Sequence, residues 1–124
     1  MARHHSDLRA RATVSVWLGD FRDELDLDVY LRTRFSADFG FEYDPGASPE
    51  TSAHAHAIGI ADLLRGFSQS RRFVDHAVEQ AALLGISEAR AAVVFYATRY
   101  EPALATKQSA PLRFLGAIVL LPSA

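Results

Sequence analysis

Apolar and polar residues alternate near the start of the chain, between residues 12 and 18. The two sets are Val14, Val16 and Leu18 on one side of an extended segment, and Thr13, Ser15 and Trp17 on the other. A period of two is typical of a half-buried β-strand. We therefore expect a strand that ends at Gly19 and Asp20.

The residues after this strand have the spacing of an amphipathic helix. Asp20 or Asp23 can cap its N-terminus, and the pattern predicts a helix that runs to about Arg34. The predicted apolar stripe consists of Phe21, Leu25, Val29 and Arg32, widened by Leu27, Tyr30 and Leu31. A short turn and an extended stretch are expected over residues 35–45, and a loop over residues 46–49.

A second, clearer helix is predicted from Ser70, which is a good N-cap residue. Its expected core face is Phe73, Val74, Ala77, Val78, Ala81 and Leu84. Gly85 can adopt the left-handed conformation that ends a helix, and Ile86 can close that end by an apolar contact. Before this helix, residues 58–64 suggest a short helix or turn that ends at Gly66.

Two strands are expected at the C-terminal end, over residues 91–99 and 112–121, joined by a long hairpin connection. The second is apolar on both faces, which indicates a central position in the sheet. The order of elements predicts an α+β fold, with a small, mostly antiparallel sheet of three or more strands and helices packed on one face. We expect a flexible arm over residues 1–11 and one domain over residues 12–124.

The composition is that of an ordinary globular domain, with 49% hydrophobic and 23% charged residues in 124. The chain has no cysteine, so disulfides and thiolate chemistry are excluded and a reducing cytoplasm is the expected location. Its N-terminus lacks the apolar segment of a signal peptide, and no apolar run is long enough to span a membrane.

Negative charge is concentrated between Asp20 and Glu50. This stretch holds nine acidic residues and three arginines, although the net charge of the whole chain is only −2. Such a field repels nucleic-acid phosphates and attracts a basic protein. The alternative is that these carboxylates only form the solvated face of a helix.

The residues that could support catalysis form no recognisable constellation. His54 and His56 are two apart, so in an extended segment both could hold a metal, with His76, Glu50 or Asp62 as a further ligand. No HExxH spacing, nucleophile motif or glycine-rich phosphate loop is present. We therefore predict no enzyme activity and no cofactor, and keep a metal-assisted hydrolase built on His54 and His56 as the alternative.

Several segments together resemble the immunity protein 22 family. They are Val14-Ser-Val-Trp-Leu-Gly19, Phe35-Ser-Ala-Asp-Phe-Gly-Phe-Glu-Tyr-Asp44, Leu63-Leu-Arg-Gly-Phe-Ser-Gln-Ser70, Val93-Val-Phe-Tyr96 and Leu112-Arg-Phe-Leu-Gly116. The resemblance implies an α+β antidote, found next to toxin genes in bacterial polymorphic toxin systems, that binds a cognate or neighbouring toxin. It carries no catalytic residues.

The expected partner is thus a protein toxin, with no nucleic acid and no membrane involved. Aromatic rings interleaved with carboxylates can anchor and steer a basic partner; the alternative is that the same rings are core residues. Trp17 likewise is either an interface anchor or a residue packed on the second face of the sheet. The predicted partner-binding residues are Trp17, Asp23, Glu24, Asp26, Asp28, Asp38, Phe41, Glu42, Tyr43 and Asp44. A scaffold module, or a homodimer formed by pairing of exposed strand edges, is a further alternative.

Overall fold

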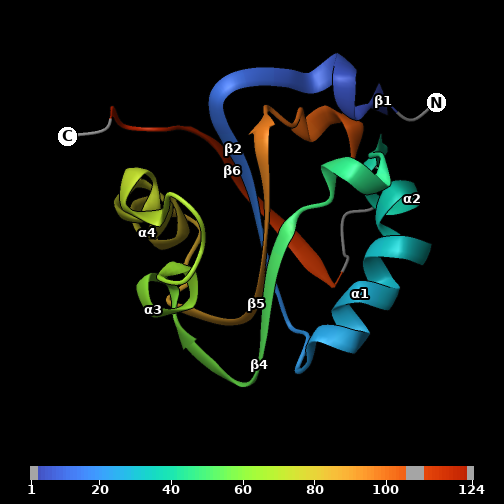
Figure 1. Ribbon diagram of the computed structural model, residues 1–124. Helices are drawn as coiled ribbons and strands as arrows, with labels where there is room; N and C mark the ends of the chain where they lie inside the picture. Colours follow the sequence, from blue (N-terminus) through green and yellow to red (C-terminus); the bar gives the residue numbers. More distant parts are fainter. Residues whose placement is uncertain (1–2, 106–110, 123–124) are drawn as a thin grey trace.

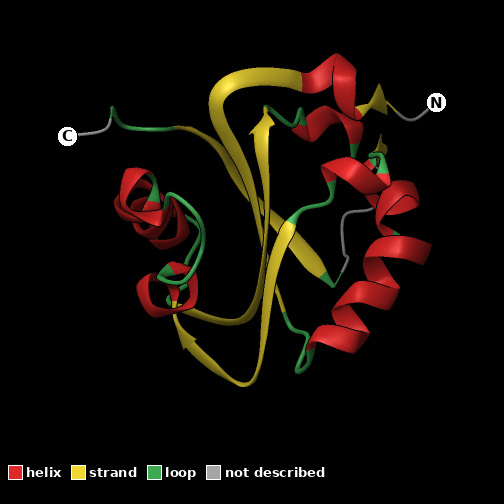
Figure 2. Ribbon diagram, viewed as in Figure 1, coloured by secondary structure: helices red, strands yellow, loops and turns green. Residues whose placement is uncertain are grey.

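The computed structural model describes residues 3–105 and 111–122 (Figures 1 and 2). Its strands are β1 (Arg3–His4), β2 (Arg9–Gly19), β3 (Phe41–Glu42), β4 (Glu50–Gly59), β5 (Glu88–Thr98) and β6 (Leu112–Val119). Its α-helices are α1 (Glu24–Thr33), α2 (Phe35–Phe39), α3 (Ile60–Leu64) and α4 (Val74–Leu83). Short 3-10 helices are η1 (His5–Leu8), η2 (Pro45–Ala47), η3 (Ser70–Arg72) and η4 (Pro102–Leu104).

The main sheet has four strands in the order β4-β5-β2-β6, and each neighbouring pair is antiparallel. A separate small pair, β1 and β3, is parallel. The predicted α+β class with a mostly antiparallel sheet is therefore confirmed. No helix among the described residues is long and apolar enough to cross a membrane.

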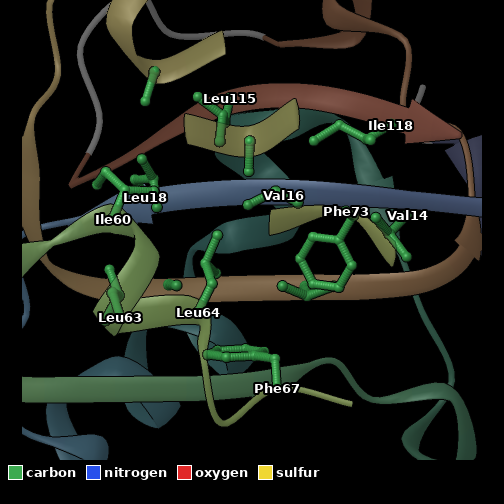
Figure 3. Packing of buried hydrophobic residues seen from close by; sticks show 14 residues of the cluster. Val14, Val16, Leu18, Ile60, Leu63, Leu64, Phe67, Phe73, Leu115 and Ile118 are labelled. Carbon is green, nitrogen blue, oxygen red and sulfur yellow. The ribbon is translucent and has the colours of Figure 1, made fainter. Parts of the chain in front are cut away.

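Strand β2 lies between two apolar clusters and is buried on both faces over residues 13–18, so the predicted half-buried strand is corrected. Val14, Val16 and Leu18 face α3 and α4, and Figure 3 shows them beside Leu64 and Phe73. Trp17 faces the other way, into a cluster formed with α1 and α2.

The prediction that helices pack on one face is wrong, because helices cover both faces of the sheet (Figure 1). Trp17 is a large apolar residue on the second face of β2, and Phe95 is its counterpart on β5. Leaving these rings in water would cost the free energy of their burial, so this face needs its own helical layer.

The two C-terminal strands do not form a hairpin, contrary to prediction. Strand β2 lies between β5 and β6, and β6 is an edge strand that pairs only with β2. Strand β6 buries residues in both apolar clusters, Leu115 and Ile118 in one and Leu112 in the other, which explains its apolar character although Arg113, Ala117 and Val119 are exposed. Of the connection between the two strands, residues 106–110 lie outside the described part of the chain.

Strand β4 was not predicted. Its alanines and histidines have little intrinsic preference for a strand, so only pairing with β5 reveals it. The pairing is interrupted between Ala53 and Ile58, where the register shifts. The segment with His54 and His56 is therefore a bulge at the other edge of the sheet.

The ends of α4 agree with the sequence only in part. The helix begins at Val74 after η3, and the hydroxyl of Ser70 donates to the carbonyl of Arg65 instead of capping α4. At the other end Gly85 has φ 75°, and the Ile86 amide donates to the Ala81 carbonyl at 2.8 Å. The predicted C-terminal closure is thus confirmed.

The first residues, expected to form an arm, carry secondary structure from Arg3 onward. Strand β1 pairs with β3, and β2 begins at Arg9, three residues before the expected boundary. The side chain of Leu8 is buried in the cluster around Trp17. The irregularity in β2 lies further on, at Ala12, which has φ 56°.

Two glycines allow the connection after β5 to approach the rest of the chain. Gly40 has φ 62°, and a Cβ atom on it would collide with the carbonyl oxygen of Leu104. A Cβ atom on Gly19 would lie 2.5 Å from a methyl carbon of Leu112 and 2.7 Å from the carbonyl oxygen of Pro111. Any side chain at these positions would push the connection away.

Candidate partner-binding site

Helix α1 is positioned by its first turn. Asp23 is the N-cap, as predicted, and its carboxylate accepts a hydrogen bond from the Asp26 amide at 2.8 Å. The helix buries Leu27, Tyr30 and Leu31 against the sheet. Two apolar residues of the predicted stripe point outward instead, with Leu25 69% and Val29 45% exposed. The sequence therefore identified the helix but misplaced the centre of its buried face.

Glu24 holds α1 against the sheet edge. One carboxylate oxygen accepts from the Ala53 amide at 2.9 Å, and the other accepts from the Thr51 hydroxyl at 3.0 Å. Both donors belong to β4. Glu24 is one of the predicted partner-binding residues and is exposed. Both of its carboxylate oxygens already accept hydrogen bonds from β4, so it stabilises the contact between α1 and the sheet.

Three of the predicted partner-binding residues lie inside the protein, so they cannot touch a partner in this structure. Trp17 and Phe41 are 0% exposed and Asp38 is 1% exposed. Trp17 packs edge-on against Phe35 and Phe95 and lies parallel to Phe41. The packing alternative for Trp17 is thus the one observed, because the second face of the sheet needs a large apolar residue.

Asp38 is buried because Tyr30 binds it. The Tyr30 hydroxyl donates to the Asp38 carboxylate at 2.7 Å, and the Arg34 guanidinium lies 3.9 Å from the same oxygen. Burial raises the pKa of Tyr30 well above its ordinary value, and the hydrogen bond to Asp38 raises it further. This pair joins α1 to α2 inside the core.

Tyr30, Tyr96 and Tyr100 should make the protein lose stability in alkali. Burial raises the pKa of each above the ordinary value of about 10. The unfolded chain releases these protons near pH 10 and the folded protein holds them, so their contribution is complete below about pH 10 and is lost as the pH rises.

The free energy of unfolding, measured by denaturant titration between about pH 8 and about pH 11, should fall above about pH 10. In Tyr30→Phe the fall should be shallower by up to about 1.4 kcal/mol per pH unit, whatever its stability at neutral pH. Equal slopes for the two proteins would contradict this assignment.

Four other predicted residues come together in one groove. Asp28 from α1, Glu42 from β3, and Tyr43 and Asp44 from the following loop line a cavity of about 690 Å³. We call this cavity the acidic groove; its remaining walls are His4, Leu31, Arg32, Ser36, Ser48, Pro49 and Thr51. Elements distant in sequence thus gather three carboxylates around one tyrosine ring.

One ion pair and one histidine–carboxylate contact lie in the walls of the acidic groove. Arg32 lies 2.9 Å from Asp28, one helical turn away, and His4 Nε2 lies 3.1 Å from Asp44. Tyr43 is half-buried and donates a long hydrogen bond of 3.4 Å to the Leu31 carbonyl. Burial, and then the nearby Asp28 carboxylate, raise the pKa of Tyr43. If His4 is counted as neutral, the groove has three carboxylates and one guanidinium, so its net charge is negative.

Arg32 and His4 were absent from the predicted site. The spacing of four residues between Asp28 and Arg32 was a usable signal for their ion pair. Nothing in the sequence places His4 beside Asp44, because that contact depends on the pairing of β1 with β3. Asp23 and Asp26, also predicted, lie exposed at the start of α1 and do not line the groove.

The histidine alternative finds no support in the geometry. His54 Nε2 lies 2.9 Å from the Ser52 hydroxyl, and His56 is exposed on the β4 bulge. Within the described ranges, no three His, Cys, Asp or Glu side chains are grouped closely enough to hold a metal. Among the described residues, His54 and His56 therefore have no third side chain with which to form a metal site.

Comparison with known proteins identifies a family. A family model described as immunity protein 22 covers residues 14–120. No curated protein and no solved structure matches the chain. The matched range includes β3 to β6, residues 14–19 of β2, and every residue of the acidic groove except His4.

Proposed function

The chain belongs to the immunity protein 22 family, and from this premise we propose that it binds a bacterial protein toxin in the cytoplasm and neutralises it without catalysis. The toxin is the product of a cognate or neighbouring gene. Neutralisation by binding requires only a complementary surface that covers or distorts the toxin's working site. It does not require reactive residues, and the sequence presents none in a recognisable arrangement.

The observation that carries this proposal is the convergence of Asp28, Glu42 and Asp44 on one groove with Tyr43 in its wall. Carboxylates around a partly apolar recess suit the lysine or arginine side chain of a basic partner, which can also lie against the tyrosine ring. Their field would also speed the encounter with such a partner. The acidic groove is therefore our proposed centre of contact.

The outer face of α1 extends this surface. Leu25 and Val29 are four residues apart and exposed, with Asp26 and Asp28 beside them. An apolar pair with a charged margin is the usual arrangement of an interface, in which apolar anchors supply affinity and the margin supplies orientation. Asp28 belongs to both the helix face and the acidic groove, so the two form one continuous surface.

Removing the groove charges should weaken toxin binding. In the triple variant Asp28→Asn, Glu42→Gln, Asp44→Asn, we expect the association rate with the toxin encoded next to this gene to fall about tenfold. The salt dependence of that rate should fall as well, because fewer charges steer the encounter. Surface plasmon resonance at two salt concentrations measures both quantities, and survival of toxin-expressing cells gives the biological result.

A matched control removes three exposed carboxylates elsewhere, by Asp75→Asn, Glu79→Gln and Glu88→Gln. It has the same net charge as the triple variant and should bind the toxin almost as the unmodified protein does. Equal losses in both variants would show that only net charge matters and would refute the acidic groove. Failure of the unmodified protein to bind or neutralise any neighbouring toxin would refute the function itself.

A further inference from the structure

The two edges of the main sheet differ in how they are protected against pairing with another chain. At the β4 edge, the carboxylate of Glu24 accepts the Ala53 amide and the Thr51 hydroxyl, and the bulge around His54 and His56 interrupts the strand. Bulges and capped amides are common ways of preventing an edge strand from pairing with another chain. The β4 edge is therefore protected.

The β6 edge has no such protection in the described part of the chain. Strand β6 pairs with β2 on one side only. Beyond that pairing, the described backbone bonds near β6 lie at its ends. The Asp20 amide donates to the Pro111 carbonyl, and the Leu120 and Leu121 amides donate to the carbonyls of Ala12 and Arg72. As far as the described residues extend, the outward amides and carbonyls of the strand itself are available to another backbone.

A groove of about 1000 Å³ follows this edge. Its floor is formed by the consecutive residues 114–119 of β6. Consecutive residues of a strand point to opposite faces, so the groove runs along the edge of the sheet and not over one face. We call it the edge groove.

Walls rise on both sides of the edge groove. His76 and Gln80 of α4, and Leu84 directly after the helix, line it on one side. Residues 99–103 line it on the other, where the ring of Tyr100 packs on Phe114. The floor is mostly apolar, and Gly116 and Ala117 leave space at its middle.

We propose that the edge groove binds an extended segment of another protein, which adds to the sheet as a fifth strand next to β6. The unpaired backbone of β6 supplies the hydrogen bonds, and the apolar floor accepts alternate apolar side chains of the segment. This site is separate from the acidic groove and does not depend on the identity of the toxin.

The walls decide between a single segment and a second copy of the chain. In a dimer built by β6–β6 pairing, each copy would bring its own α4 and its own residues 99–103 to the same narrow space. A single extended segment has no such walls and fits between them. The edge groove therefore favours a peptide-like segment over the homodimer considered from the sequence.

A display library of random ten-residue peptides tests this proposal without any toxin. We expect enriched peptides to alternate apolar and polar residues and to protect β6 amides from hydrogen exchange that are unprotected in the free protein. Ala117→Arg fills the groove at an exposed position and should weaken the affinity for these peptides by about tenfold or more. Ala82→Arg, on the exposed side of α4 away from the groove, should leave their binding unchanged.

Three results would overturn the proposal. A library without binders, or binders that protect other strands and ignore Ala117→Arg, would show that the edge does not accept a strand. Light scattering that finds a dimer abolished by Ala117→Arg would assign the edge to a second copy. None of these measurements uses a toxin. A negative result would therefore refute strand addition at the edge groove without affecting the proposed neutralising function, and a failure to neutralise a toxin would not refute strand addition.

Discussion

Trp17→Ala is expected to lower the free energy of unfolding by about 4 kcal/mol, the largest effect of any single substitution considered for this chain. Trp17 is 0% exposed and packs among the rings of Phe35, Phe39, Phe41, Phe95, Tyr100 and Phe114. These rings come from helices, strands and connections, so they cannot all move together to fill the space. The cavity would remain and each ring would lose contacts.

The change is measured by guanidinium unfolding followed by far-ultraviolet circular dichroism, because Trp17 is the only tryptophan and its fluorescence disappears with it. Leu25→Ala, at an exposed position of α1, is the control and should cost less than about 1 kcal/mol. If Trp17→Ala does not fold, Trp17→Phe should fold with a smaller loss of about 1–2 kcal/mol. The indole Nε1 has no hydrogen-bond partner among the described residues, so replacing it sacrifices no bond seen there. A loss below about 1 kcal/mol in Trp17→Ala would contradict the central position of this residue.

Gly40→Ala should be the next most damaging change, with a loss of about 3 kcal/mol. Part of this is the cost of the left-handed backbone for a residue with a side chain, about 1–2 kcal/mol. The rest is steric, because the added Cβ would collide with the Leu104 carbonyl oxygen. A backbone atom cannot rotate away as a side chain can, so the connection after β5 must shift.

Gly85→Ala separates these two contributions. Gly85 has φ 75°, in the same region as Gly40, but among the described residues no atom lies within 4 Å of the place that its Cβ would take. It should therefore show only the backbone cost of about 1–2 kcal/mol in the same unfolding experiment. Equal losses for the two variants would mean that the approach of Leu104 contributes nothing.

Local patterns in the sequence were sufficient to identify β2, α1, α4 and β5. In each, apolar spacing or a capping residue such as Asp23 reports the element directly. Strand β4 could not be found this way, because its alanines and histidines are strand residues only through pairing with β5. The order of the strands was equally out of reach, since β6 shows the same apolar character at an edge that a central strand would show.

The same limit applies to the candidate site. The acidic character of the region was evident from the sequence, but the arrangement of its side chains in space was not. Asp38 lies between Ser36 and Glu42 in the sequence, two residues that line the acidic groove, yet it points inward because Tyr30 meets it in the core. Glu24, which was predicted to meet a partner, also holds β4. Which carboxylates remain for a partner depends on tertiary contacts that no local pattern encodes.

The motifs that carry the family resemblance mainly build the interior of this chain. Trp17 fills a core cluster, Gly19 and Gly40 admit the connection after β5, and Asp38 receives the Tyr30 hydroxyl. The family motifs therefore mainly determine the fold. We expect recognition of a particular partner to depend on the exposed residues between these motifs.

The central place of β2 has a consequence for the order of events during protein synthesis. This strand is made well before both of its neighbours, β5 and β6. At typical rates of elongation, β2 waits about 5–20 s for the last of them. Until then its apolar faces are open to chaperones or to other nascent chains, so the newly made protein should be most prone to aggregation in this interval.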